Sequence, residues 1–295
     1  MYSEGDLQDA VTAGVLSPQA AQALRDHVAQ LRASPVVDEE SFRLLTGFND
    51  IFVAIAGIIL LVAVGWLGNS VRLGAAEHHP SFMSGALVAA VSWGLAEYFT
   101  RQRRMALPSI LLLAGFVGGV AFALGALAGQ LFPDVGDRVA SLIISGVAAF
   151  SALAAWMHWR RFMVPITVAA GAAAAAGVVG GLVLAAFPGD IRLAYLLLLA
   201  GGLAIFALAM RWDMSDRTRT TRRADVAFWL HLTAAPMIAH SLFNLLGVFR
   251  GDDISIGKAL VVILLYIAFG LVGLAIDRRA LLVSSLAYVL FALYA

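Results

Sequence analysis

The sequence predicts an all-α fold: a polytopic membrane helix bundle of about nine spans built from helical hairpins, with a short cytoplasmic helical hairpin at the N-terminus. Three observations support this prediction. Hydrophobic residues make up 61% of the chain and charged residues only 13%, about half the charged share of a globular protein. The apolar residues form long runs separated by short polar breaks. These breaks alternate between arginine-rich and arginine-poor, which is the positive-inside pattern of multispan membrane proteins.

Nine apolar segments are candidates for the spans. A helix that crosses the hydrocarbon layer needs about 20 residues, with a range of about 17–25. The ninth segment meets this length poorly, so a short tilted span, a half-inserted helix and an incomplete span stay open there, and eight spans with a terminal stub is the main alternative. The segments are Ile51–Gly68, Ser81–Phe99, Leu107–Phe132, Val139–Trp159, Phe162–Phe187, Leu193–Met210, Val226–Phe249, Ala259–Ile276 and Ala280–Ala295.

The distribution of basic residues predicts the orientation. The region before Ile51 and the breaks on the same side hold 15 of the 20 lysines and arginines. Because cytoplasmic loops of membrane proteins carry an excess of lysine and arginine, we expect the N-terminus in the cytoplasm and the chain in a bacterial inner (plasma) membrane. The arginines of the rich breaks are Arg101, Arg103 and Arg104, then Arg160 and Arg161, then those from Arg211 to Arg223, then Arg278 and Arg279.

Composition and missing motifs exclude several classes of function. The formal net charge is only +1, which gives no electrostatic basis for binding nucleic acid. The chain has no cysteine, so disulfides and thiolate metal sites are excluded. No P-loop, GxSxG or HExxH string occurs, and no aspartate or glutamate lies at the middle of a span. We therefore predict no metal, no cofactor and no catalytic residues, and the missing carboxylates argue against ion-driven transport.

The hairpins show signs of an internal repeat. Phe132-Pro133 and Phe187-Pro188 end two successive odd-numbered spans, and the string RRMALP resembles RRFMVP one unit later. In this interpretation each unit is a pair of spans joined at an arginine-poor break, and successive units face the same way, as a parallel repeat. The alternative is that all the hairpins simply share turn residues and basic ends.

Glycine is concentrated in the third and fifth spans. Small residues spaced four apart let helix backbones approach closely in a membrane. This spacing predicts that both spans lie buried in the centre of the bundle; that they line a narrow passage is the second interpretation. The glycines concerned are Gly115, Gly119, Gly125, Gly129, Gly177 and Gly181.

We expect a cytoplasmic helical head over residues 1–36 and a transmembrane helical domain over residues 37–295. Gly14 suits the C-terminal end of a first short helix, and Ser17 with Pro18 suits the start of a second. Two helices of this size bury a marginal core. The head is therefore expected to dock on another surface, which can belong to its own membrane domain, a second copy of the chain or a partner protein.

The head also carries a resemblance. The string LQDAVTAGVLSPQAAQAL, followed by a first span reading AGIILLVAVGWLG, resembles the uncharacterised bacterial multispan membrane proteins of the DUF2157 family. That family places a short cytoplasmic head before several spans, and it lends neither catalytic residues nor a known substrate. The resemblance covers about the first quarter of the chain. The matching residues are Gly14, Val15, Leu16, Ser17, Ala20 and Ala21.

The seventh segment holds the richest set of polar side chains. Most of them recur every three or four residues and so share one helix face, whereas His231 lies nine residues from His240, near the opposite side unless Pro236 kinks the helix. One interpretation is a buried stripe that fastens this helix to its neighbours. The other is a cavity where His240 and Asn244 bind a ligand or shuttle a proton, because histidine has an unperturbed pKa of about 6.5.

Glu97 is a carboxylate within an otherwise apolar span. It lies four residues before Arg101, so an ion pair along the helix is one role, and a gate or proton site is the other. Ionisable residues inside spans are costly and are functional candidates by default. The candidate ligand-binding residues are therefore His231, Thr233, His240, Asn244 and Glu97.

Three hypotheses for function follow. The first is transport or binding of a small or lipid-like molecule within the bundle, with a cavity lined by His240 and Asn244. The second is an accessory or scaffold subunit of a membrane complex that docks through residues 1–36. The third is an intramembrane enzyme, which requires a carboxylate or metal within bonding distance of His231 or His240. The partners expected are the lipid bilayer, a small-molecule or lipid ligand, and a protein partner or second copy.

Overall fold

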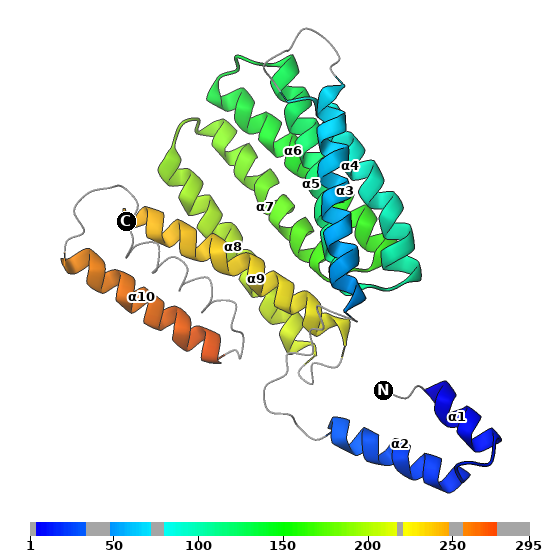
Figure 1. The fold of residues 1–295 in the computed structure, drawn as a ribbon. Helices are drawn as coiled ribbons and strands as arrows, with labels where there is room; N and C mark the ends of the chain where they lie inside the picture. Colours follow the sequence, from blue (N-terminus) through cyan, green and yellow to red (C-terminus); the bar gives the residue numbers. More distant parts are fainter. Residues whose placement is uncertain (1–3, 34–47, 72–79, 217–220, 248–255, 276–295) are drawn as a thin grey trace. The chain divides into compact units, whose positions relative to one another are not determined.

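The computed structural model describes residues 4–33, 48–71, 80–216, 221–247 and 256–275, and these residues form helices joined by short turns, with no strand among them (Figure 1). The chain divides into two compact units, Met1–Phe42 and Arg43–Ala295.

The first unit contains α1 (Glu4–Thr12) and α2 (Pro18–Ala33), which contact each other. Gly14 has a φ of +71°, the left-handed conformation that commonly follows a helix C-terminus and that glycine adopts without a steric penalty. The Ser17 hydroxyl accepts a hydrogen bond from the Ala20 N–H at 3.1 Å, so Ser17 acts as the N-cap that its side chain predicts. Among the apolar side chains, Ala21 is fully buried whereas Val15 is 79% exposed.

The described residues of the second unit contain seven helices that are long and apolar enough to cross a membrane. An eighth helix, α10 (Ile256–Ala275), follows them, whereas the predicted ninth span at Ala280–Ala295 lies outside the described residues. The predicted count of about nine spans is therefore not confirmed. The seven are α3 (Asn49–Ser70), α4 (Phe82–Ala96) with its π-helical continuation η1 (Glu97–Gln102), α5 (Ala106–Leu131), α6 (Asp137–Phe162), α7 (Ile166–Ala186), α8 (Ile191–Met214) and α9 (Arg222–Leu245).

Polar residues in the breaks start and stop these helices. Ser81, Asp190 and Thr221 lie just before α4, α8 and α9, and each side chain accepts a hydrogen bond from a backbone N–H of the first turn. This satisfies N–H groups that have no partner inside the helix. Phe132 and Phe187 follow α5 and α7 in nearly the same conformation, with φ and ψ of −135° and 66° against −125° and 69°. A proline follows each, which prevents the helix from continuing.

The helices pack in close antiparallel pairs, but not the pairs that the sequence suggested. The most extensive contacts join α4 to α5, α6 to α7 and α8 to α9. Each of these pairs is connected at an arginine-rich break, whereas the predicted hairpins were joined at the arginine-poor breaks.

Small residues allow two of these pairs to approach closely. A side chain on Gly119 of α5 would place its Cβ 2.7 Å from the backbone oxygen of Gly85 on α4, and a Cβ on Gly181 of α7 would lie 2.8 Å from the backbone oxygen of Ser141 on α6. Real Cβ atoms do not come this close to a backbone oxygen, so only glycine fits at these two crossings. The glycines therefore serve pairwise packing.

The most buried helix is α9. About 56% of its most apolar stretch is buried, against 17–22% for the other six candidate spans. It packs on α7 and α8, and its Val226, Leu230 and Ala234 belong to the main apolar core. The glycine-rich third and fifth spans, α5 and α7, were predicted to lie buried in the centre of the bundle, but only 17% of the most apolar stretch of each is buried, so the described residues do not bear this prediction out.

Candidate functional site

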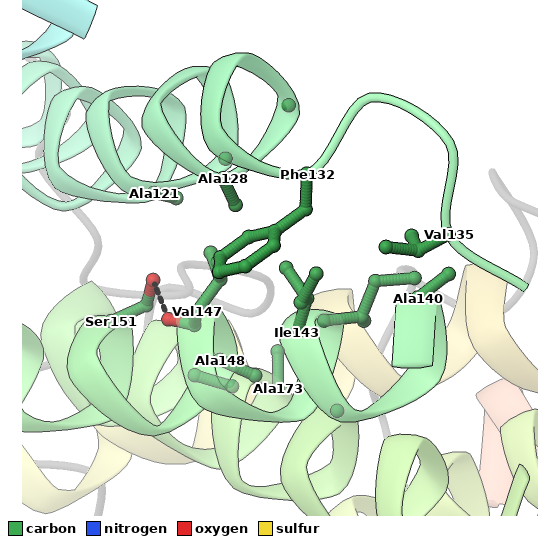
Figure 2. Close-up of a pocket in the computed structure, with 15 residues that line it drawn as sticks. Ala121, Ala128, Phe132, Val135, Ala140, Ile143, Val147, Ala148, Ser151 and Ala173 are labelled. Atoms are coloured by element: carbon green, nitrogen blue, oxygen red, sulfur yellow. Dashed lines mark hydrogen bonds between the residues drawn. The ribbon is translucent and has the colours of Figure 1, made fainter. Parts of the chain in front are cut away.

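A groove between α5, α6 and α7 forms a partly open apolar hollow with a volume of about 560 Å³ (Figure 2). It lies between the C-terminal half of α5, the N-terminal half of α6 and the middle of α7, toward the arginine-poor break at residues 132–136. Its walls come from Ala121, Gly125, Ala128, Gly129, Phe132, Val135, Ala140, Ile143, Ile144, Val147, Ala148, Ser151, Ala173, Ala174 and Gly177.

The groove exists because the sequence supplies too little side-chain volume there. Packed helices keep their axes about 8–10 Å apart, and alanine and glycine cannot fill the space between three of them. Nothing lies within 4 Å of the Cβ position at Gly125 or Gly129. These two glycines, which the sequence predicted to pack against another helix, instead border open space, and the ring of Phe132 points into the groove between the helices (Figure 2).

The walls of the groove offer apolar contacts to a ligand. Its one hydroxyl, that of Ser151, donates to the backbone oxygen of Val147 in the same helix at 2.8 Å (Figure 2). A smaller hollow of about 260 Å³ lies on the other side of α7, between α6, α8 and α9, and shares Ile144, Ala173 and Gly177 with the first. A molecule that fits here is therefore apolar, such as a lipid acyl chain.

Thr233, His240 and Asn244 do not line either hollow. Thr233 donates its hydroxyl to the backbone oxygen of Trp229 at 2.9 Å, and Asn244 donates through Nδ2 to the backbone oxygen of His240 at 2.9 Å. The Nδ2 atom of Asn244 also lies 3.2 Å from Nε2 of His240. The structure thus brings His240 and Asn244 together, and the hydrogen bond from Asn244 to the His240 backbone lies within α9. The ring of Tyr195 on α8 stands 6.0 Å from that of His240.

His231 lies apart from that pair and contacts a residue that the sequence analysis did not select. Its Nε2 is 2.8 Å from Oδ2 of Asp213 in the last turn of α8. The His231 side chain is fully buried and its Nδ1 has no hydrogen-bond partner among the described residues. The carboxylate that the enzyme hypothesis requires is therefore present. The described residues contain no group of three potential metal ligands.

Glu97 joins two helix pairs. Its carboxylate accepts hydrogen bonds from Nε of Arg161 at 2.7 Å and from Nη2 at 2.8 Å, and it lies 3.4 Å from Nη1 of Arg101. The predicted pair with Arg101 is present, but the shorter, two-pronged pair is with Arg161, on α6. Two parallel N–H···O bonds give such a pair a fixed geometry. Glu97 is the first residue of the π-helical η1, and π-helical turns are frequent at functional sites.

His158 of α6 is a second buried histidine that the sequence analysis did not select. Its Nδ1 lies 3.2 Å from the hydroxyl oxygen of Thr167 on α7, and its Nε2 has no partner among the described residues. The rings of Trp93, Phe116 and Phe162 surround it at centroid distances of 6.3, 6.0 and 4.6 Å. The side chain thereby links α4, α5, α6 and α7 in one cluster.

A periodicity argument could have found Asp213. Gly202, Ile205 and Ala209 are the buried residues of α8, and a spacing of three and then four residues leads to position 213 on the same face. The predicted span ended at Met210, which placed Asp213 in the following loop. For His158 no such signal exists, because it lies at the end of its predicted span beside Trp159 and two arginines, as a residue at the membrane surface would.

The chain matches no family model, no curated protein and no solved structure.

Proposed function

We propose that the protein is a multispan membrane protein that binds the acyl chain of a lipid, or a similar lipid-like molecule, in the groove between α5, α6 and α7. The observation that carries the proposal is the open apolar hollow of about 560 Å³. Ligand sites in proteins occupy about 300–1,000 Å³ and are lined mainly by apolar side chains. The proposal extends to transport of the bound molecule across the membrane.

The strength of binding depends on fit rather than on hydrophobicity. Lipid tails are as apolar as the groove walls, so no hydrophobic force draws a chain out of the bilayer into the groove. A retained molecule must instead gain close contacts that a mobile lipid does not make. The rigid walls of α5, α6 and α7 provide such contacts on three sides.

The test is photochemical labelling of the full-length protein in vesicles with a phospholipid that carries a diazirine in its acyl chain. We expect labelled peptides from the groove wall at Ile143 and Val147. The variant Gly125→Leu fills the groove without a backbone clash and should lower this labelling at least fivefold. The matched control is Gly118→Leu on the same helix, where a Cβ also meets nothing within 4 Å but which does not line the groove. Equal labelling of both variants would contradict the proposal.

The second candidate function is that of an accessory or scaffold subunit that docks through residues 1–36. The first unit favours it, because Val15 is 79% exposed and Leu24 is 44% exposed on a small helical unit. The mass of the purified protein in mild detergent, measured by light scattering, tests this candidate. A docking head predicts a defined homo-oligomer or a complex with one stoichiometric partner that Val15→Glu dissociates, whereas a monomer in both proteins contradicts it.

A further inference from the structure

We propose that the two short arginine-rich turns at the ends of α4 and α6 form a binding surface for the phosphate headgroup of an anionic phospholipid. This proposal rests on the placement of the helices in a membrane. It does not depend on the groove, which lies toward the opposite ends of α5 and α6. We call the site the arginine surface, and it consists of Arg101, Arg103, Arg104, Arg160 and Arg161.

One carboxylate brings the two turns together. Glu97 in η1 accepts both hydrogen bonds of the Arg161 fork from α6, at 2.7 and 2.8 Å, and also lies 3.4 Å from Arg101. Phe162, the last residue of α6, packs its ring 5.0 Å from that of Trp93 on α4. Arginines that are 56 or more residues apart in the sequence therefore lie at one end of the bundle rather than on separate loops.

Positive charge is in excess at this end. The described stretches 97–105 and 156–165 contain five arginines and a single carboxylate, that of Glu97, so four positive charges are not balanced there. Neither Arg104 nor Arg160 has a carboxylate within ion-pair distance among the described residues. All five arginines are exposed. The planar guanidinium group matches phosphate oxygens with two parallel N–H bonds.

Aromatic rings hold two of the guanidinium groups at the depth of lipid headgroups. Arg160 lies over the ring of Trp156 at 5.4 Å, and Arg103 lies 5.4 Å from the ring of Tyr98 and donates to its hydroxyl. Trp156 is 55% exposed and Tyr98 is 42% exposed. Exposed tryptophan and tyrosine at helix ends mark the boundary between hydrocarbon and headgroups, which is the depth at which a lipid phosphate lies.

The expected size of the effect follows from the number of arginines. A basic residue near an anionic membrane surface contributes enough attraction to change affinity about fivefold. Arg104 and Arg160 have no carboxylate partner among the described residues. Together they are therefore expected to give an anionic phospholipid an affinity about 25-fold higher than that of a neutral one. Because both side chains are exposed and make no ion pair, their replacement is not expected to disturb the fold.

The experiment compares phosphatidylglycerol with phosphatidylcholine of identical acyl chains, bound to the full-length protein and counted by native mass spectrometry. We expect R104Q/R160Q to lower the preference for phosphatidylglycerol about 25-fold. The matched control is R138Q/R192Q, which removes the same charge from exposed positions at the other helix ends and should leave the preference unchanged. An equal loss in both double variants, or no loss in either, would overturn the proposal.

Two further arms separate this proposal from a structural role of the charges and from the groove. Glu97→Gln removes the negative charge beside the surface and should raise the affinity for phosphatidylglycerol, whereas a purely structural carboxylate would give an unchanged or lower affinity. Gly125→Leu fills the groove and should leave the headgroup preference intact. Inorganic phosphate in place of lipid should bind far more weakly, and equally tight binding of both would show an anion site unrelated to the membrane.

Discussion

Polar side-chain contacts join neighbouring helices of the second unit. Each contact links two helices, and each involves an ionisable side chain inside or near an apolar stretch. Such residues are expensive in a membrane unless they find partners. The contacts are Glu97 with Arg161, His158 with Thr167, and His231 with Asp213.

The His231–Asp213 contact predicts a clear cost for losing the carboxylate. Asp213→Ala removes the partner at 2.8 Å from a histidine with no exposed surface. We expect the free energy of unfolding to fall by about 1–2 kcal/mol, the usual penalty for an unpaired buried polar group. Equilibrium unfolding of the two proteins by a denaturing detergent measures this difference in the free energy of unfolding.

Asp213→Asn serves as the control for this prediction. Asparagine keeps the volume and can still form one hydrogen bond to the imidazole ring, so the loss should be less than half of that seen for Asp213→Ala. If neither variant lowers the free energy of unfolding, the contact contributes nothing to stability.

The Glu97–Arg161 pair predicts a specific charge complementarity between two helix pairs. Glu97→Arg places a third guanidinium group beside Arg161 and Arg101 and should lower the thermal midpoint of the purified protein through like-charge repulsion. Adding Arg161→Glu to this variant restores an opposite pair and should recover most of the midpoint. A double variant less stable than Glu97→Arg alone would show that the two side chains do not interact.

Only some of these side-chain contacts could be predicted from the sequence. The contact of Glu97 with Arg101 follows from helix geometry and is present at 3.4 Å, because residues four apart on a helix are neighbours. Arg161 is 64 positions away, and no local pattern points to it. The same limit applies to His240 and Asn244. Their shared face could be predicted, whereas the finding that they bond within α9 required coordinates.

At the scale of helices, adjacent glycines have opposite roles. Gly118 and Gly119 are neighbours in α5, yet a Cβ at the first meets nothing within 4 Å and a Cβ at the second would lie 2.7 Å from a backbone oxygen of α4. Sequence spacing identified the close crossing at Gly119. It also predicted close packing for Gly125 and Gly129, which border the groove instead, because spacing does not say which face of a helix has a neighbour.

This difference predicts the outcome of a matched pair of substitutions. Gly119→Ala forces α4 and α5 apart and should reduce the free energy of unfolding by about 1–3 kcal/mol, as overpacking of a tight contact does. Gly118→Ala should leave stability unchanged or raise it slightly, since alanine favours a helix over glycine. Detergent-induced unfolding of the two proteins checks this, and a larger loss for Gly118→Ala would contradict the packing of these helices.

Helix positions were the most predictable feature of the elements. Seven of the predicted spans overlap the seven candidate spans of the structure, because an uninterrupted apolar stretch and a capped polar break are both local properties. The pairing of helices was not predictable in the same way. Close pairs form across the arginine-rich breaks, and the sequence repeat at Phe132 and Phe187 marks equivalent helix ends without saying which helix lies beside which.

For the whole molecule, the account depends on seven helices crossing a bilayer with the arginine-rich breaks on one side. Length and apolar composition of the helices agree with this, and the formal charge pattern predicts the side. The described turn at residues 103–105 precedes α5, and the turn at residues 132–136 follows it. If α5 crosses a membrane, these two turns must therefore lie on opposite faces of it.

The most direct test is labelling of single cysteines with a membrane-impermeant maleimide in intact bacterial cells, in a chain that has no cysteine of its own. Gln102→Cys and Asp134→Cys place the thiol at exposed positions at the two ends of α5. We predict that the thiol at position 134 reacts in intact cells and the thiol at position 102 reacts only after the cells are opened. Reaction of both thiols in intact cells, or of the thiol at position 102 alone, would contradict the account.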